Sequence, residues 1–316
     1  MSCVPEAKLL GDWISDQGLS KSAEVTVRKR KGMAIASIYE IRTVVEDCRS
    51  NILGGLSTGL DLWESAVVPM LLFNSETWTS ISPATLETLE NIQKRFYRCL
   101  LAVGSGCPIP SLYWETGGTL MKYRILQRKL LLLHHIATLS DSCLAKEVYN
   151  LQKELNLPGL VSECSNVLRE NDIFDIAMYS KYQWKKIAKS ITCKLNKDEL
   201  IRMSKKYKKI DYSWDDNLTT RHSYLNGMKV NDARMLFKIR SKMAPTIQMN
   251  FPSDKTYAAN KWICSACLIN LDTQDHVINC EEYSKYREGL NLDEDEDLVK
   301  YFQSIVNLRS GQTIIQ

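Results

Sequence analysis

Four side chains that commonly bind metal ions cluster near the C-terminal end of the sequence. Cys264, Cys267, His276 and Cys280 follow the pattern C-x2-C-x8-H-x3-C. Two thiolates separated by two residues can reach one ion from a tight turn, and residues four positions apart lie on one face of a helix. Three thiolates and one imidazole leave no open coordination position, so the pattern predicts one structural Zn2+ per chain. Binding would supply folding free energy on the order of 10 kcal/mol to this small segment.

Two other interpretations of these cysteines remain open. A redox-active C-x-x-C pair normally opens a helix after a strand in a thioredoxin-like unit, and the sequence KWICSAC lacks that context. The cysteines could also fall close together by chance. His276 and Cys280, which stand at ligand spacing, favour zinc over both alternatives.

Two further stretches resemble catalytic motifs. Residues 55–59 match the G-x-S-x-G string of a hydrolase nucleophile elbow, but the preceding SNIL is too short for the buried strand which that motif needs. Residues 212–216, YSWDD, resemble the Tyr-x-Asp-Asp of polymerase palms, but the spacing is wrong by one residue and apolar flanking strands are missing. His134 and His135 lie in a leucine-rich segment and are interpreted as packing and surface residues. We therefore predict no catalytic residue in this chain.

A continuous basic run lies in the first helical segment. It consists of Arg28, Lys29, Arg30 and Lys31, which on a helix point in nearly all directions and so cannot form a one-sided charged stripe. A solvated helix surface is one interpretation of the run, and contact with phosphates is the other.

A second basic segment spans residues 181–209, with eleven Lys or Arg against two acids. Aromatic residues, among them Tyr182 and Trp184, interleave with it. This composition is typical of a surface that follows a phosphate backbone and stacks on bases, although a solvated helix has a similar composition. The candidate nucleic-acid contacts here are Lys181, Lys185, Lys186, Lys189, Lys205, Lys206, Lys208 and Lys209.

The overall composition narrows the class of protein. With 44% hydrophobic and 25% charged residues, the 316-residue chain is typical of a globular protein of two or three structural units. A net charge of +4 is too small to indicate nucleic-acid binding by itself. Its apolar runs are too short to cross a membrane, and its N-terminus does not resemble a signal peptide. We expect an intracellular protein, cytoplasmic or nuclear, whose ten cysteines stay reduced and which has no small-molecule substrate.

The elements that would position these groups are predicted to be helices. Ser82 as N-cap, with Pro83 at the first helical position and Gly104 past the end, gives the clearest helix boundaries. Helical spacing of apolar residues, together with helix start and stop signals, predicts helices at about 20–47, 83–100, 120–139, 141–155 and 158–170.

Other segments are predicted to interrupt the helices. Residues 50–61 are rich in Gly, Ser and Thr and predict a break, and Pro69 predicts a kink or a helix end. Residues 104–118 contain two prolines and four glycines and predict a loop. Acidic residues dominate beyond Glu281 and predict a partly loose acidic ending.

Three segments together resemble the region that follows the polymerase palm in LINE-like (non-LTR) retrotransposon reverse transcriptases. Residues 8–15, KLLGDWIS, are similar to the Tyr-Leu-Gly strand near the end of the palm. Residues 69–78, PMLLFNSETW, resemble the post-palm P-x-L-L-y-x-x-E-x-W segment. Residues 264–280 resemble the Cys-Cys-His zinc module of the family, and the three pieces occur in the same order.

The resemblance implies a helical, thumb-like region that grips RNA template or DNA primer, and a zinc module that assists nucleic-acid binding during target-primed reverse transcription. The catalytic aspartates of the family would lie before Met1, so only the zinc ligands are transferred. We expect a mainly α protein with the following parts: a palm remnant and first helix (1–50), a thumb-like helical region (51–180), a basic helical connector (181–255), a zinc knuckle (256–290) and an acidic tail (291–316).

The expected function is therefore binding of RNA or DNA template–primer without catalysis by this chain. The alternative is a zinc-stapled helical module that binds another protein, either host-adopted or a decayed copy of an element. A linear fall of log affinity with log salt would distinguish nucleic-acid binding from most protein interfaces.

Overall fold

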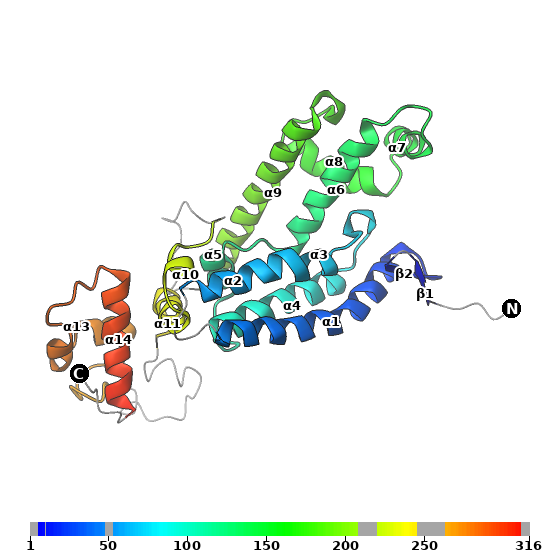
Figure 1. The fold of residues 1–316 in the computed structure, drawn as a ribbon. Coiled ribbons are helices and arrows are strands. Elements are labelled where there is room, and N and C mark those ends of the chain that lie inside the picture. Colours follow the sequence, from blue (N-terminus) through cyan, green and yellow to red (C-terminus); the bar gives the residue numbers. More distant parts are fainter. Residues whose placement is uncertain (1–5, 10, 48–52, 208–219, 245–262, 311–316) are drawn as a thin grey trace.

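The chain is mainly helical, as predicted (Figure 1). The structure is a computed structural model, and it describes residues 6–9, 11–47, 53–207, 220–244 and 263–310. Its strands and α-helices are β1 (Glu6–Leu9), β2 (Asp12–Ser15), α1 (Leu19–Asp47), α2 (Gly55–Leu62), α3 (Val68–Leu71), α4 (Pro83–Leu101), α5 (Ile109–Thr116), α6 (Met121–Ala137), α7 (Leu144–Glu154), α8 (Leu160–Glu170), α9 (Lys181–Ser204), α10 (Tyr224–Gly227), α11 (Val230–Arg240), α13 (Gln274–Asn279) and α14 (Asp295–Arg309). Short 3-10 segments lie at Ser75–Thr77, Ile176–Met178 and Glu281–Tyr286, and a π-helical turn lies at Trp63–Val67.

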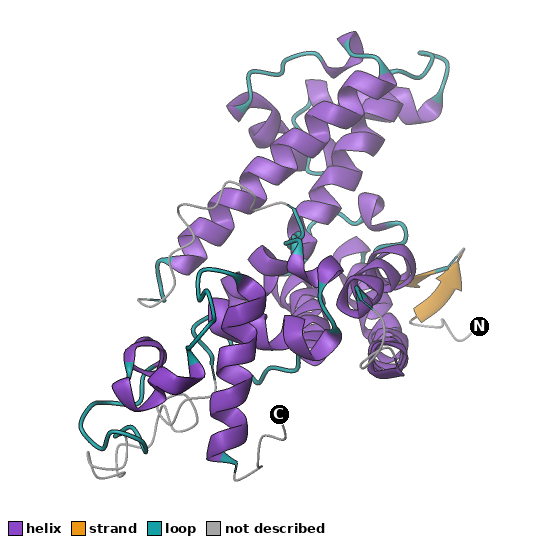
Figure 2. Ribbon diagram, turned by 60° about the vertical axis from the view of Figure 1, so that its left-hand side comes forward, coloured by secondary structure: helices purple, strands orange, loops and turns teal. Residues whose placement is uncertain are grey.

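Three regions make up the molecule. Helices α1 to α5, with α10 and α11, form the body; α6 to α9 form a helical arm (residues 121–204); and residues 263–310 form the C-terminal module. The arm rises from the body, and the module lies beside α11 (Figure 1). The paired strands β1 and β2 form a hairpin at the N-terminal edge (Figure 2). Among the described helices, none is both long enough and apolar enough to cross a bilayer.

Aromatic side chains fill the centre of the body. Trp63 stacks on Phe96 of α4, with ring centroids 4.2 Å apart, and Tyr97 meets Tyr113 edge-on at 5.3 Å. All four side chains are at most 1% exposed. Such pairs add about 0.5–1.5 kcal/mol each to the stabilisation from burial, so this cluster joins α4 firmly to its neighbours.

The break predicted at 50–61 is shorter than expected, because α2 begins at Gly55. Gly59 lies inside this helix, where an added Cβ would stand 2.7 Å from Leu100 Cδ1 and 2.8 Å from Val45 Cγ2. The glycine therefore serves close packing of α2 against α4 and α1, and the interpretation of it as a breaker was wrong.

Pro69 does not end the helical path of the chain. The chain continues from α2 through the π-helical turn into α3, and the Val68 N–H donates to the Trp63 carbonyl, five residues back. The wider turn places Pro69 at the start of a new α-helical stretch, where its missing N–H and its ring are tolerated.

The predicted start of α4 is confirmed. Ser82 Oγ accepts a hydrogen bond of 3.2 Å from the Thr85 N–H, and Pro83 is the first helical residue. At the other end Ala102, with φ 52°, adopts the left-handed conformation that terminates the helix, two residues before Gly104.

Residues 104–118 are not a loop throughout, because α5 occupies Ile109–Thr116. Most of this short helix is buried, and Tyr113 and Trp114 are fully so. Prolines are tolerated in a first helical turn, where the N–H groups have no helical partner. Gly117, with φ 65°, ends the helix, since its backbone conformation favours glycine.

The arm has its own apolar cluster, to which α6, α8 and α9 contribute. Trp184 of α9 is 1% exposed, and its indole Nε1–H donates to the Leu130 carbonyl of α6 at 2.8 Å. Asn196 fastens α9 to the body: its side chain accepts from the Leu120 N–H at 3.0 Å and donates to the Gly118 carbonyl at 3.2 Å. The helix at the start of the predicted basic connector is therefore a packed part of the arm.

The acidic ending is more ordered than predicted. Helix α14 spans Asp295–Arg309 and buries Val299, Phe302 and Ile305. Its first turn contains three acids, which stabilise a helix N-terminus because they complement the helix dipole. An acidic composition therefore concealed an amphipathic helix.

Candidate metal centre and cationic surfaces

The four predicted metal ligands converge. Their ligand atoms all lie within 4.8 Å of one another, and Cys267 Sγ is 3.4 Å from His276 Nε2. A tetrahedron with metal–sulfur bonds of about 2.3 Å has ligand–ligand edges of about 3.8 Å, so the cluster suits a small tetrahedral ion. Cys264 and Cys280 are buried, whereas the other two ligands are partly exposed. The group can hold one metal ion.

Backbone hydrogen bonds place the first two thiols. Ile263 and Leu271 form an isolated antiparallel bridge, and the Cys264 N–H donates to the Asn270 carbonyl at 2.8 Å. The Leu268 N–H donates back to the Cys264 carbonyl at 3.0 Å, and Leu268 has a left-handed φ of 55°. The tight turn predicted for the C-x2-C pair is confirmed.

Helix α13 places the other two ligands. Thr273 is its N-cap, and the Thr273 Oγ1 accepts a hydrogen bond of 3.0 Å from the His276 N–H. Cys280 follows the last helical residue, with an extended backbone (φ −64°, ψ 126°). His276 thus lies on the helix as predicted, whereas Cys280 lies just past its end.

The surroundings of the two thiols differ. Backbone N–H groups of Asn270 and Ile269 lower the pKa of Cys267 to about 6, which favours its thiolate. Burial raises the pKa of Cys280 to about 11, and the neighbouring Cys264 adds to this shift. A cation held by the four ligands would offset the second effect, because it stabilises thiolates.

A buried ion pair, which sequence analysis missed, joins the metal-binding turn to α14. Asp272 is fully buried and accepts hydrogen bonds from Arg309 at 2.7 and 3.0 Å. The same guanidinium donates to the Tyr283 hydroxyl at 3.2 Å. Bidentate pairs of this kind are among the stronger hydrogen bonds in proteins. Because the partners are 37 residues apart, no local sequence pattern indicates the pair.

Two amide side chains fasten the C-terminal module to α11. Gln274 Nε2 donates to the Ile239 carbonyl at 3.0 Å, and Gln303 Nε2 donates to the Asp232 carboxylate at 2.7 Å. The first lies in the helix that carries His276 and the second in α14. The metal centre is therefore held against the body from two sides.

The basic run on α1 includes a buried structural arginine. Arg30 is 7% exposed, pairs with Asp12 at 2.6 Å and donates to the carbonyls of Gly11, Leu71 and Phe73. It links the β-hairpin to α1 and to the end of α3. These contacts contradict the prediction that Arg30 binds nucleic acid, because its donors are already satisfied inside the protein.

The other members of that run have different surroundings. Arg28 forms an ion pair of 2.6 Å with Glu6, and Lys29 Nζ lies 4.8 Å from the centre of the Trp13 ring. Lys31 is exposed and has no ion-pair partner among the described residues. As predicted, the run does not form a one-sided stripe.

Helix α9 presents the clearest cationic surface. Lys181, Lys185, Lys186 and Lys189 are exposed and form no ion pair within the part of the chain that the structure describes. Tyr182 is 69% exposed, and Lys186 Nζ lies 4.5 Å from the centre of its ring. Positions 182, 185, 186 and 189 are three or four residues apart and share one helix face. We call Tyr182, Lys185, Lys186 and Lys189 the lysine stripe.

Lys205 and Lys206 are exposed directly after α9. Lys208 and Lys209, together with the YSWDD segment at 212–216, lie outside the described residues.

The basic residues of α6 are engaged with acids from other elements. Arg124 pairs with Glu64 at 2.6 Å, and Lys129 pairs with Glu163 at 2.5 Å. Because of these ion pairs, the basic residues of α6 contribute little free cationic surface.

The structure also places the residues of the other motifs. Residues 55–59 all lie inside α2, so Ser57 does not stand at the strand-to-helix turn that a nucleophile elbow requires. His134 is buried, with Nε2 2.9 Å from the Tyr179 carbonyl, and His135 is exposed. Their interpretation as packing and surface residues is confirmed.

Comparisons of the chain with protein-family models, with curated proteins and with solved structures found no match. Its function must therefore be inferred from the metal centre and the cationic surface themselves.

Proposed function

We propose that this chain is a non-catalytic, nucleic-acid-binding protein related to the C-terminal part of a LINE-like retrotransposon reverse transcriptase. The lysine stripe on α9 is the observation that carries the proposal. Cations along one helix face can follow a phosphate backbone, and an exposed aromatic ring can stack on a base. The expected ligand is RNA or DNA template–primer.

We further propose that the C-terminal module holds one structural Zn2+. Three thiolates and an imidazole at tetrahedral spacing are the donors that zinc prefers, and the complete ligand set leaves no position for a reacting water. Cysteine ligands stay reduced in the cytoplasm and nucleus, which is where we place the working protein.

The proposed activity is binding without polymerisation. Polymerases hold their Mg2+ ions with carboxylates. Among the described residues, the cluster of three cysteines and His276 is the one group of three or more side chains that could hold a metal. Mg2+-dependent primer extension by this chain would contradict the proposal.

Nucleic-acid binding is tested with a fluorescent single-stranded oligonucleotide, by anisotropy across a salt series. Log affinity should fall linearly with log salt, because each neutralised phosphate releases counterions. The double variant Lys186→Gln, Lys189→Gln should reduce the steepness of the slope by about 1.4, at about 0.7 per phosphate contact on a single strand.

The matched control is Lys153→Gln, Lys229→Gln, which removes the same charge from exposed positions outside α9. It should leave the slope unchanged. No binding at low salt, or an equal loss in the control, would count against nucleic-acid binding through the stripe.

Binding of another protein is the second candidate function, and one observation favours it. Helix α7 buries none of its side chains, and Leu144, Val148 and Leu151, with Leu155 directly after the helix, are all at least 44% exposed. Their spacing of four, three and four residues places them on one helix face, as in helix pairs. The salt series separates the two candidates, because most protein interfaces respond to salt less steeply.

A further inference from the structure

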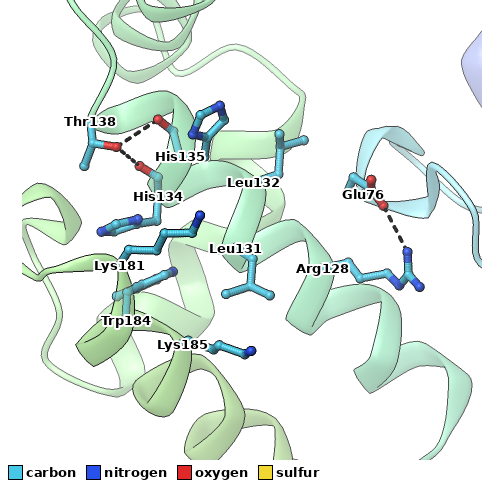
Figure 3. A pocket seen from close by; sticks show the side chains of 10 residues that line it. All are labelled: Glu76, Arg128, Leu131, Leu132, His134, His135, Thr138, Lys181, Trp184 and Lys185. Atoms are coloured by element: carbon cyan, nitrogen blue, oxygen red, sulfur yellow. Dashed lines mark hydrogen bonds and ion pairs between the residues drawn. The ribbon is translucent and has the colours of Figure 1, made fainter. Parts of the chain in front are cut away.

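An open pocket of about 580 Å3 lies between α6, α9 and the 3-10 turn Ser75–Thr77 (Figure 3). Its volume is in the range of small-ligand sites. It is separate from the metal centre, and it shares Lys185 with the lysine stripe. Its two sides offer different chemistry to a ligand.

The α9 side of the pocket is cationic. Lys181 and Lys185 reach into the space between the two helices (Figure 3). Neither ammonium group has an ion-pair partner among the described residues. His135 of α6 adds an exposed imidazole to the lining. Two lysines and an imidazole are suited to an anionic group such as a phosphate.

The opposite side offers a hydrogen-bond acceptor. Glu76 Oε2 is buried and has no hydrogen bond, but it forms an ion pair of 3.6 Å with the Arg128 guanidinium (Figure 3). The Glu76 side chain as a whole is 27% exposed and lines the pocket, so its carboxylate can accept a hydrogen bond from a ligand that brings a donor group. A simple anion would not satisfy it.

An apolar wall connects the two sides. Leu131, Leu132 and Trp184 line the pocket, and the Trp184 ring stacks on His134 at 5.5 Å, with 10° between the ring planes. Hydrogen bonds from Trp184 Nε1 to the Leu130 carbonyl and between His134 and the Tyr179 carbonyl fix both rings. Because the Trp184 ring is 1% exposed, Leu131 and Leu132 present most of this apolar wall to a ligand, and the two fixed rings make the wall rigid.

We propose that this pocket binds one nucleotide of a single-stranded nucleic acid. Its phosphate lies at Lys181 and Lys185, its base lies against the apolar wall, and an amino or hydroxyl group donates to Glu76. The inference rests on the proposed function, because a strand that follows the lysine stripe reaches the pocket at Lys185. It adds that the protein prefers an unpaired strand, since a base in a duplex cannot enter the pocket.

The four histidines provide a direct test on the full-length protein. His134 and His135 line the pocket, whereas His222 lies beside Glu115 and His276 lies in the metal centre. In the NMR spectrum of histidine-labelled protein, adenosine monophosphate should shift the signals of the two pocket histidines and leave the other two in place. Four unchanged signals at millimolar nucleotide would overturn the inference. Equal shifts with inorganic phosphate alone would also overturn it, in favour of a simple anion site.

Two substitutions, one on each side of the pocket, test the role of each side in ligand binding. Lys181→Gln should weaken nucleotide binding about tenfold, as expected for the loss of one hydrogen bond to a charged group. Glu76→Gln should weaken binding of the nucleotide but not of phosphate. The control Lys153→Gln, at an exposed position of α7 outside the pocket lining, should bind the mononucleotide normally. Unchanged nucleotide affinity in both pocket variants would overturn the assignment.

The oligonucleotide and mononucleotide measurements together distinguish an error in the pocket inference from an error in the proposed function. If an oligonucleotide binds with the expected salt slope but single and double strands bind equally, the pocket inference fails and nucleic-acid binding stands. If the mononucleotide shifts His134 and His135 but no oligonucleotide binds, the proposed function fails and the pocket is a site for a free nucleotide.

Discussion

The C-terminal module and the helical arm differ in what holds them together. The arm depends on apolar packing spread over three helices, with Trp184 and Leu133 at its centre. The module packs apolar side chains such as Val277, Tyr301 and Phe302 into the main core, and it adds two localised links, the cluster of candidate metal ligands and the Asp272–Arg309 pair. Distributed packing loses stability gradually as side chains are removed, whereas a localised link is present or absent. The two regions should therefore respond differently to single substitutions.

The largest effect is expected from removal of the metal site. The double variant Cys264→Ser, Cys267→Ser should lose the proposed zinc and about 10 kcal/mol of stabilisation in the module. Metal analysis of the purified protein, with hydrogen exchange of both regions, would show loss of protection in residues 263–310 and normal protection in the arm. Cys143→Ser, outside the cluster, is the control. Well-folded wild-type protein that contains no zinc would refute the premise.

Truncation of the aromatic centre of the arm should have the next largest effect. Trp184→Ala should lower the free energy of unfolding by about 3–5 kcal/mol, as expected for a large buried side chain. Denaturant unfolding measures the loss, and zinc content should stay the same. Simultaneous loss of zinc would show that the two regions unfold as one unit. It would contradict the proposed difference between the arm and the C-terminal module.

Breaking the ion pair of the module should cost about 3 kcal/mol, because Arg309→Met removes the bidentate guanidinium from a buried carboxylate. Asp272→Asn combined with Arg309→Met should recover part of the loss, since it removes the uncompensated charge. Thermal unfolding of the zinc-loaded protein measures both variants. A larger loss in the double variant than in Arg309→Met would argue against a role for the pair.

Substitutions in the lysine stripe should have the smallest effect on the free energy of unfolding. Lys186→Gln, Lys189→Gln should change the free energy of unfolding by no more than about 0.5 kcal/mol, because both side chains are exposed. Equilibrium unfolding in denaturant would check this. A loss comparable to that of Trp184→Ala would mean that the lysines are structural, and it would weaken the functional interpretation of their exposure.

Local signals predicted part of this molecule well. The N-cap of α4 and the turn around Cys264 are determined by residues within a few positions, so both could be predicted from the sequence. The ligand set was predicted for the same reason: its spacing alone permits convergence on one ion.

Features that depend on tertiary packing could not be predicted in this way. In the sequence alone, Gly59 indicates a break in the helix. Its role in close packing is evident only from the position of Leu100, which lies against it in the folded protein. Arg30 and Lys186 have the same charge in sequence, but one is enclosed by carbonyl groups and the other is exposed. Residues 108–116 combine two turn-forming prolines with a helix that is stable because it is buried.

The Asp272–Arg309 pair also interlocks two loops of the chain. The proposed metal would close the loop 264–280, and the ion pair closes the loop 272–309, so the two loops would overlap at 272–280. A mechanical pull on the residues that follow α14 would load the ion pair before it reached any metal–sulfur bond. Under force, the ion pair should therefore yield first and shield the metal centre.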